Sequence, residues 1–210
     1  MAQKLIESKT MDSDRFVPVY KKLYTEDCCL DNEVYGDVSR RDDYFVDFVK
    51  NYVAKGSTIL DASCGRGHLM KSLISRAYNN VVGTEIAECL LDKDLKGLDV
   101  TILPYSKIDS LGENKFDVVI SNDVLEHLPD EESVNDALRR LSFISKKWLL
   151  ISVGIRNARA YCKKYKLSIP NLHSVRRRRS WWDDTISRRG IISNRSTKTN
   201  SYYVACRVGG

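Results

Sequence analysis

Short β-rich runs alternate with helical segments along most of this 210-residue chain, and this alternation limits the folds it can adopt. Five runs have the length and composition of strands: 57–61, 80–85, 99–103, 115–121 and 148–153. Apolar residues recur at helical spacing in segments that begin at Asp43, Gly67, Ala87 and Asp130, the last placed to cap its helix. Strands that alternate with helices predict a doubly wound α/β fold with a parallel sheet.

The C-terminal part of the chain departs from this alternation. Two β-rich runs, 191–193 and 202–206, are separated by a polar stretch with no helical segment between them. They predict a hairpin, which would add an antiparallel strand to the sheet. The expected fold is therefore a mostly parallel seven-stranded sheet with an antiparallel C-terminal hairpin.

Length and composition are typical of one globular domain. Hydrophobic residues make up 42% of the chain and charged residues 30%, which argues against wholesale disorder. Residues 1–42 are polar and predict an N-terminal arm or lid, and residues 43–210 predict the main domain. The chain has no apolar run of membrane-spanning length, no apolar segment of a secretory signal and no C-x-x-C pair among its six cysteines. We therefore expect a cytoplasmic location and reduced thiols.

Positive charge is concentrated after the fifth predicted strand. The net charge is +6, but the segment 155–189 alone carries +9. In it, four consecutive arginines (176–179) precede Trp181 and Trp182, and arginines bind phosphates while tryptophans stack on bases or sugars. The segment therefore predicts a phosphate-bearing ligand, a nucleic acid or an anionic sugar-lipid. The alternative is a solvated loop that enters a helix at 181–188, and for the two tryptophans we favour packing on the sheet.

A glycine loop follows the first predicted strand, at the place where ligands bind in doubly wound sheets. Gly65 and Gly67 permit a tight turn and a close approach of the backbone to a ligand. Glu85 ends the second strand, 20 residues after Gly65, and is placed to bind ribose hydroxyls. Met70 stands where the dinucleotide fingerprint has its third glycine, which disfavours a nicotinamide-dependent dehydrogenase.

Two segments resemble motifs of the class I methyltransferases that use S-adenosylmethionine (SAM). Residues 59–67, Ile-Leu-Asp-Ala-Ser-Cys-Gly-Arg-Gly, are similar to motif I of that family, and residues 116–128 are similar to its fourth-strand motif. The resemblance runs from about Tyr44 to Val208 and implies a Rossmann-like methyltransferase fold and an enzyme of class EC 2.1.1.-. The chain departs from the family pattern at 104–106, where an acidic residue is usual, and at 145–147, where a Pro-Gly-Gly turn is usual.

The resemblance implies that the glycine loop and the strand ends bind SAM. Loop residues, Asp61 among them, would hold the methionine end of SAM, Glu85 would hold the ribose, and Ile86 would flank the adenine. Asn122 and Asp123 would lie beside the transferable methyl group. The complete expected cofactor-binding set is Asp61, Ser63, Cys64, Gly65, Gly67, Glu85, Ile86 and Asn122.

Asp123, Glu126 and His127 offer three potential metal ligands within five residues, and on a helix they would share a face. His173, from the insertion at 155–189, would complete the set. The spacing resembles the acidic-x-x-Glu-His element of metal-assisted O-methyltransferases of the ubiquinone pathway and of small RNAs. This resemblance implies a divalent cation such as Mg²⁺ on these four residues, with Asp123, His127 and His173 as catalytic residues. The alternative is that Glu126 and His127 are structural, because Leu-Glu-His-Leu is common in this superfamily without a metal.

The sequence thus predicts a SAM-dependent methyltransferase that acts on an oxygen of a small or conjugated metabolite. Two alternatives stay open. An RNA methyltransferase would use the basic segment 155–189, and a catalytically inactive SAM-binding subunit would serve a partner.

Overall fold

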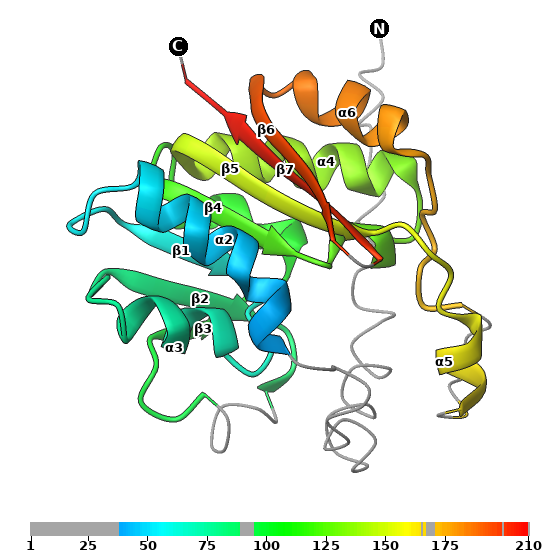
Figure 1. Cartoon of the computed structure of the whole chain (residues 1–210), viewed down its shortest axis with the longest axis horizontal. Helices are drawn as coiled ribbons and strands as arrows, with labels where there is room; N and C mark the ends of the chain where they lie inside the picture. Colours follow the sequence, from blue (N-terminus) through cyan, green and yellow to red (C-terminus); the bar gives the residue numbers. More distant parts are fainter. Residues whose placement is uncertain (1–37, 89–94, 165, 167–170, 199, 210) are drawn as a thin grey trace, which may run out of the picture.

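The computed structural model describes residues 38–88, 95–164, 166, 171–198 and 200–209, which form one seven-stranded sheet with helices on both faces (Figure 1). The strand order is β3-β2-β1-β4-β5-β7-β6. The strands are β1 Ile59–Ala62, β2 Val81–Glu85, β3 Val100–Ile102, β4 Phe116–Asn122, β5 Ser145–Gly154, β6 Ile191–Lys198 and β7 Ser201–Arg207. Strands β1 to β5 run parallel, and β7 pairs antiparallel with both β5 and β6. The predicted sheet and its C-terminal hairpin are confirmed.

Helices cover both faces of the sheet (Figure 1). The helices are α2 Val38–Tyr52, α3 His68–Ile74, α4 Glu131–Ile144, α5 Arg159–Lys164 and α6 Arg179–Ser187, with 3₁₀ helices η3 Tyr105–Leu111 and η4 Leu125–His127. Helices α2 and α3 pack on one face of the sheet, and α4 and α6 pack on the other, whereas α5 lies away from the sheet (Figure 1). No described helix is long and apolar enough to cross a membrane.

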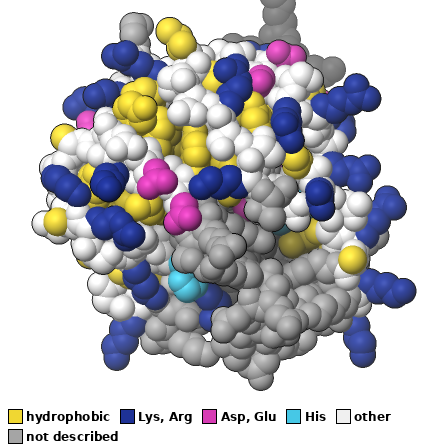
Figure 2. All heavy atoms as spheres, viewed as in Figure 1, with side chains coloured by type: hydrophobic (Ala, Val, Ile, Leu, Met, Phe, Trp, Pro, Cys, Tyr) yellow, Lys and Arg dark blue, Asp and Glu magenta, His cyan; other side chains and the backbone are white. Residues whose placement is uncertain are grey.

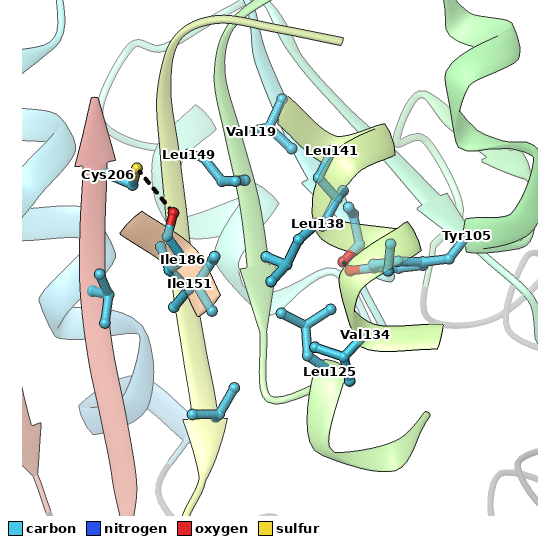
Figure 3. Packing of buried hydrophobic residues seen from close by; sticks show 14 of the residues in the cluster. Tyr105, Val119, Leu125, Val134, Leu138, Leu141, Leu149, Ile151, Ile186 and Cys206 are labelled. Carbon is cyan, nitrogen blue, oxygen red and sulfur yellow. Dashed lines mark hydrogen bonds between the residues drawn. The ribbon is translucent and has the colours of Figure 1, made fainter. Parts of the chain in front are cut away.

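Each central strand contributes side chains to both cores because successive residues point to opposite faces. In β4, Val118 and Ile120 join the core under α2 and α3, whereas Val119 joins the core under α4 and α6. Figure 3 shows the second core, in which Leu138 and Leu141 of α4 point toward the strands. This double burial explains why β4 reads as a continuous apolar run.

A side-chain cap fixes the start of α4, and packing on the core fixes the two tryptophans of α6. The carboxylate of Asp130 accepts a hydrogen bond from Ser133 N at 2.8 Å, which confirms the predicted cap of α4. Trp182 is fully buried and Trp181 packs against the same core, so packing is confirmed for both tryptophans.

Four expectations differ from the structure or lie outside it. Residues 123–127 do not form one helix, because Asp123 has a φ of 51° and only η4 follows it. The predicted helix at 87–96 lies largely outside the described residues, and so does most of the expected arm at 1–42. Strand β6 extends through Lys198, because its polar residues pair with β7 on the sheet edge.

Candidate functional site

The glycine loop turns sharply at the carboxyl end of β1. Ser63, Gly65 and Gly67 all have positive φ angles, of 62°, 53° and 70°. A Cβ atom on Gly67 would lie 2.5 Å from Leu98 Cδ1, so both its conformation and its surroundings favour glycine. Cys64 N donates to Thr84 O at 2.8 Å, which ties the loop to β2. The loop backbone is thus held open at the end of the strand, where a ligand can approach it.

Met70 occupies the position of the third glycine of the dinucleotide fingerprint, and its side chain lies close to Gly83 of β2. A Cβ atom on Gly83 would lie 2.7 Å from Met70 Sδ and 2.9 Å from Cys64 Sγ. The small residue that lets α3 pack closely on the sheet is therefore in β2 and not in α3. Burial beside Asp61 and Glu85 raises the pKa of the Cys64 thiol far above its usual value, so the thiol stays protonated and packs in the core.

Glu85 links the second strand to the glycine loop. Its Oε2 accepts a hydrogen bond from Gly65 N at 2.8 Å, and its Oε1 accepts from Ile86 N at 2.8 Å and Ala87 N at 3.0 Å. Its side chain is 4% exposed, and burial raises the pKa of its carboxyl although the three amides act in the opposite direction. Asp61, at 2% exposure, lies in β1 opposite Gly83. Two buried carboxyl groups therefore flank the loop.

Asn122 and Asp123 lie at the carboxyl end of β4, next to β1 in the sheet. Ser152 of β5 holds both: its Oγ lies 2.7 Å from Asn122 Oδ1 and 3.0 Å from Asp123 Oδ1, and it accepts a hydrogen bond from Asp123 N at 2.9 Å. Ser201 Oγ donates to Asp123 Oδ2 at 3.2 Å. These contacts fix the left-handed conformation of Asp123.

Glu126, in η4, is buried against the end of β5. Its Oε1 accepts a hydrogen bond from Gly154 N at 2.6 Å, and its backbone carbonyl accepts from Val175 N at 3.0 Å. A Cβ atom on Gly154 would lie 2.8 Å from Glu126 Oε1 and 2.6 Å from His173 Cε1. The absence of a side chain at Gly154 therefore lets Glu126 and His173 approach each other.

His127 and His173 stack edge to face, with ring centroids 4.9 Å apart. His127 Nδ1 lies 3.1 Å from Leu172 O, and His173 Nδ1 lies 2.5 Å from Arg156 O. A carbonyl can only accept, so each Nδ1 carries a proton, and in the neutral form of either ring the lone pair is on Nε2. Burial and the neighbouring His173 lower the pKa of His127 to about 3, against the opposing effect of backbone carbonyls.

Glu126, His127 and His173 offer ligand atoms that all lie within 4.8 Å of one another. The structure therefore brings together three of the four predicted metal ligands. The fourth, Asp123, is outside this group and is hydrogen-bonded by the hydroxyls of Ser152 and Ser201. A neutral imidazole and a carboxylate are the ligand forms that divalent cations bind.

Sequence reasoning missed three residues that shape the site. Ser152 and Gly154 escaped notice because their roles depend on pairing with β4 and η4, which no local pattern shows. Tyr105, in the segment that departs from the family pattern, is buried and its hydroxyl lies 3.1 Å from Ala62 O and 2.9 Å from Ser121 Oγ. Its hydroxyl therefore links the ends of β1 and β4. His68, the first residue of α3, is exposed.

The geometry matches that of known proteins. Residues 60–142 match the family described as methyltransferase domain. The magnesium protoporphyrin IX methyltransferase of Synechocystis, solved with bound S-adenosylhomocysteine (SAH), superposes with a TM-score of 0.69 over 95% of this chain and 99% of that chain, at 19% identity. The chain therefore has the fold of these SAM-binding methyltransferase structures, and its residues 60–142 match a methyltransferase domain.

Curated relatives of this methyltransferase domain share its core segment. The ubiquinone biosynthesis O-methyltransferase of Hydrogenovibrio crunogenus is 32% identical over 124 residues, which are 55% of this chain and 51% of that protein. The corresponding enzyme of Hahella chejuensis is 35% identical over 105 residues, which are 46% of this chain and 44% of that protein. The chain thus spans about half the length of the curated relatives it matches.

Proposed function

We propose that this protein is a SAM-dependent methyltransferase whose acceptor is an oxygen of a small or conjugated metabolite. The observation that carries the proposal is the convergence of the glycine loop, Glu85 and Asn122 at the carboxyl ends of three neighbouring strands, β2, β1 and β4. The match of residues 60–142 to methyltransferase domains supports this use of the site. Its similarity to ubiquinone biosynthesis O-methyltransferases supports an oxygen acceptor.

The cofactor would lie across the loop. Asp61 and the loop residues Ser63, Cys64, Gly65 and Gly67 would hold the methionine end of SAM. An ionised carboxylate has about four lone-pair positions, and amides occupy three of those on Glu85, so one is left for a ribose hydroxyl. Ile86, half-buried after β2, would flank the adenine, and Asn122 would face the methyl group.

The proposed reaction is an in-line displacement on the methyl carbon. The acceptor oxygen forms a bond to that carbon, the carbon–sulfur bond breaks, and its electron pair goes to sulfur to give SAH. The acceptor hydroxyl must also lose a proton, and Asp123, at the end of β4 beside Asn122, would take it. His127 is a weak proton acceptor because its pKa is lowered to about 3, so it suits metal binding better than base catalysis.

A divalent cation would fit the group formed by Glu126, His127 and His173, whose two imidazoles suit a transition metal such as Fe²⁺ or Zn²⁺ better than the predicted Mg²⁺. The donor set is one carboxylate and two imidazoles, and the carbonyl contacts of both Nδ1 atoms orient the rings as in many metal sites. Such a cation, when bound, would lower the pKa of an acceptor hydroxyl. The three side chains would hold and orient the acceptor end of the site.

Calorimetric titration with SAM and SAH tests the cofactor part of the proposal. We expect micromolar binding by the wild-type protein and a loss of about tenfold or more in Glu85→Ala, since hydrogen bonds to charged groups contribute about 1.5–3 kcal/mol. His68→Ala, on the exposed side of α3, is the matched control and should bind as wild type. No binding by folded wild-type protein would refute the proposal.

Two further measurements test the metal and the acceptor. Loss of the electron paramagnetic resonance signal of free Mn²⁺ reports binding directly, without any assay of activity, and binding below about 1 mM is expected for a three-ligand site. Transfer of labelled methyl from SAM is then measured to panels of hydroxyl-bearing and amine-bearing small molecules. Transfer to amines alone would contradict the oxygen acceptor.

A further inference from the structure

Four consecutive arginines form one wall of a hollow on the acceptor side of the molecule. The hollow has a volume of about 390 Å³ and is lined by Ile155 and by Arg176, Arg177, Arg178 and Arg179. The arginines lie in the segment that leads from α5 to α6, close to the carboxyl end of β5 (Figure 1). All four side chains are exposed.

The charge of this hollow is only partly compensated. Arg177 forms an ion pair with Glu131, the first residue of α4. In the part of the chain that the structure describes, Arg176 and Arg178 have no acidic partner, and the guanidinium of Arg179 lies 5.9 Å from the ring centroid of Tyr202. On the face seen in Figure 2, lysine and arginine side chains are more frequent than acidic ones. Like charges held together favour a bound anion.

The hollow adjoins the group formed by Glu126, His127 and His173. Ile155 directly follows Gly154, whose N–H donates to Glu126 Oε1. Arg176, which also lines the hollow, directly follows Val175, whose N–H donates to Glu126 O. A molecule whose anionic end occupies the hollow would therefore present its other end to the Glu126 side of the site.

We propose that this hollow binds a phosphate group of the methyl acceptor, and that the acceptor is a phosphorylated small molecule. The inference rests on the proposed function and names its substrate class. Arginine presents a planar fork of donors that matches two phosphate oxygens. The volume suits a small ligand, since pockets for small molecules span about 300–1,000 Å³.

The aromatic residues beside the arginines argue against a single-stranded RNA acceptor. Sequence-tolerant RNA binding uses exposed aromatic rings on which bases stack. Trp182 is fully buried, and Trp181 packs edge to face on it at a centroid distance of 4.9 Å and against the core. Trp182 lies in the interior and Trp181, half-buried, packs on it, so neither offers a fully exposed ring for stacking beside the arginines.

Calorimetry with phenyl phosphate, on protein saturated with SAH, tests the proposal. We expect the double variant Arg176→Gln/Arg178→Gln to bind phenyl phosphate about tenfold more weakly than wild type or worse, because charge-assisted hydrogen bonds to phosphate are lost. The double variant Arg188→Gln/Arg207→Gln removes the same charge from exposed positions outside the hollow and should bind within about twofold of wild type. Equal weakening in both variants, or no binding of phenyl phosphate by wild type, would overturn the proposal.

A twelve-nucleotide single-stranded RNA of mixed sequence is the second probe. Binding of the RNA about 100-fold tighter than phenyl phosphate, with a steep decrease as salt rises, would replace the small-molecule acceptor by RNA. The SAH titration that precedes each measurement separates the two proposals. Intact SAH binding without phosphate binding refutes only the hollow, whereas phosphate binding without SAH binding refutes the methyltransferase proposal.

Discussion

The two halves of the site are built in different ways. In the cofactor half, the glycine loop and the end of β2 are joined by hydrogen bonds to Glu85 from Gly65 and from the two residues that follow Glu85. In the acceptor half, Glu126 and His127 of η4 are held by the end of β5 and by the segment 171–175. The first half consists of one strand–loop–helix–strand unit, and the second needs three separate segments.

This difference predicts how each half of the site responds to substitutions. The contact from Gly65 to Glu85 spans 20 residues and joins the ends of paired strands, so the sheet itself maintains it. The contact from Leu172 to His127 spans 45 residues and depends on a segment outside the sheet. If the halves are independent, substitutions in one should leave the ligand of the other in place.

The largest effect is expected in the acceptor half. We expect His127→Ala to weaken Mn²⁺ binding by about 100-fold or more, since even second-shell partners of metal ligands contribute about 10–100-fold. SAM affinity should stay within about threefold of wild type, because His127 lies outside the cofactor half. Electron paramagnetic resonance and calorimetry on the same sample check both values. Parallel losses of Mn²⁺ and SAM would show that the two halves are one unit.

The complementary test is a substitution in the cofactor half. Asp61→Asn keeps the shape of a side chain that is 2% exposed and removes its charge. We expect SAM affinity to fall by about 10–100-fold, because hydrogen bonds to charged groups contribute about 1.5–3 kcal/mol. Mn²⁺ affinity should not change. An unaltered SAM affinity would remove Asp61 from the proposed site.

A pair of glycines tests how tightly the acceptor half is packed. At Gly154 a Cβ atom would lie 2.6 Å from His173 Cε1, whereas at Gly56 it would meet nothing within 4 Å. We expect Gly154→Ala to lower the free energy of unfolding by about 1–3 kcal/mol, as overpacking does, and to weaken Mn²⁺ binding. Gly56→Ala should change stability by less than about 0.5 kcal/mol. Urea unfolding measures both, and equal stabilities would mean that His173 moves aside freely.

The fold was largely predictable from sequence because its signals are local. Each strand from β1 to β5 carries its own β-rich run, and Asp130 marks the start of α4 by its own side chain. The glycine loop was equally visible, since the positive φ angles of Gly65 and Gly67 favour the residue type that the sequence shows there. The extent of β6 was not visible, because its polar residues are held by pairing with β7.

The acceptor half could be predicted only as a set of candidates. Spacing suggested that Asp123, Glu126 and His127 share a helical face, but the φ of 51° at Asp123 turns the chain and sends its carboxylate to Ser152 and Ser201. His173 joins Glu126 and His127 because Gly154 leaves room for it. Such placement depends on long-range packing, which residue spacing does not encode.

The smallest effect concerns pH and returns to the cofactor half. Burial raises the pKa of Glu85 above its ordinary value of 4.5. Between pH 4.5 and the raised pKa of the folded state, the native protein holds a proton that the unfolded chain has lost. This contribution to stability is therefore full below pH 4.5 and disappears as pH rises through the folded pKa. Urea unfolding of wild type and Glu85→Gln, without SAM and from about pH 4 to about pH 8, measures it.

The quantity to compare is the wild-type free energy of unfolding minus that of Glu85→Gln, since other groups titrate in both proteins alike. This difference should fall as pH rises above 4.5, because only the wild type must ionise a buried carboxyl. A difference that rises with pH would mean that the amides of Gly65, Ile86 and Ala87 outweigh burial and hold Glu85 ionised. The cofactor half would then be organised around a charge before any ligand arrives, whereas a falling difference would mean that burial outweighs the amides and that the folded protein ionises Glu85 at a cost in stability.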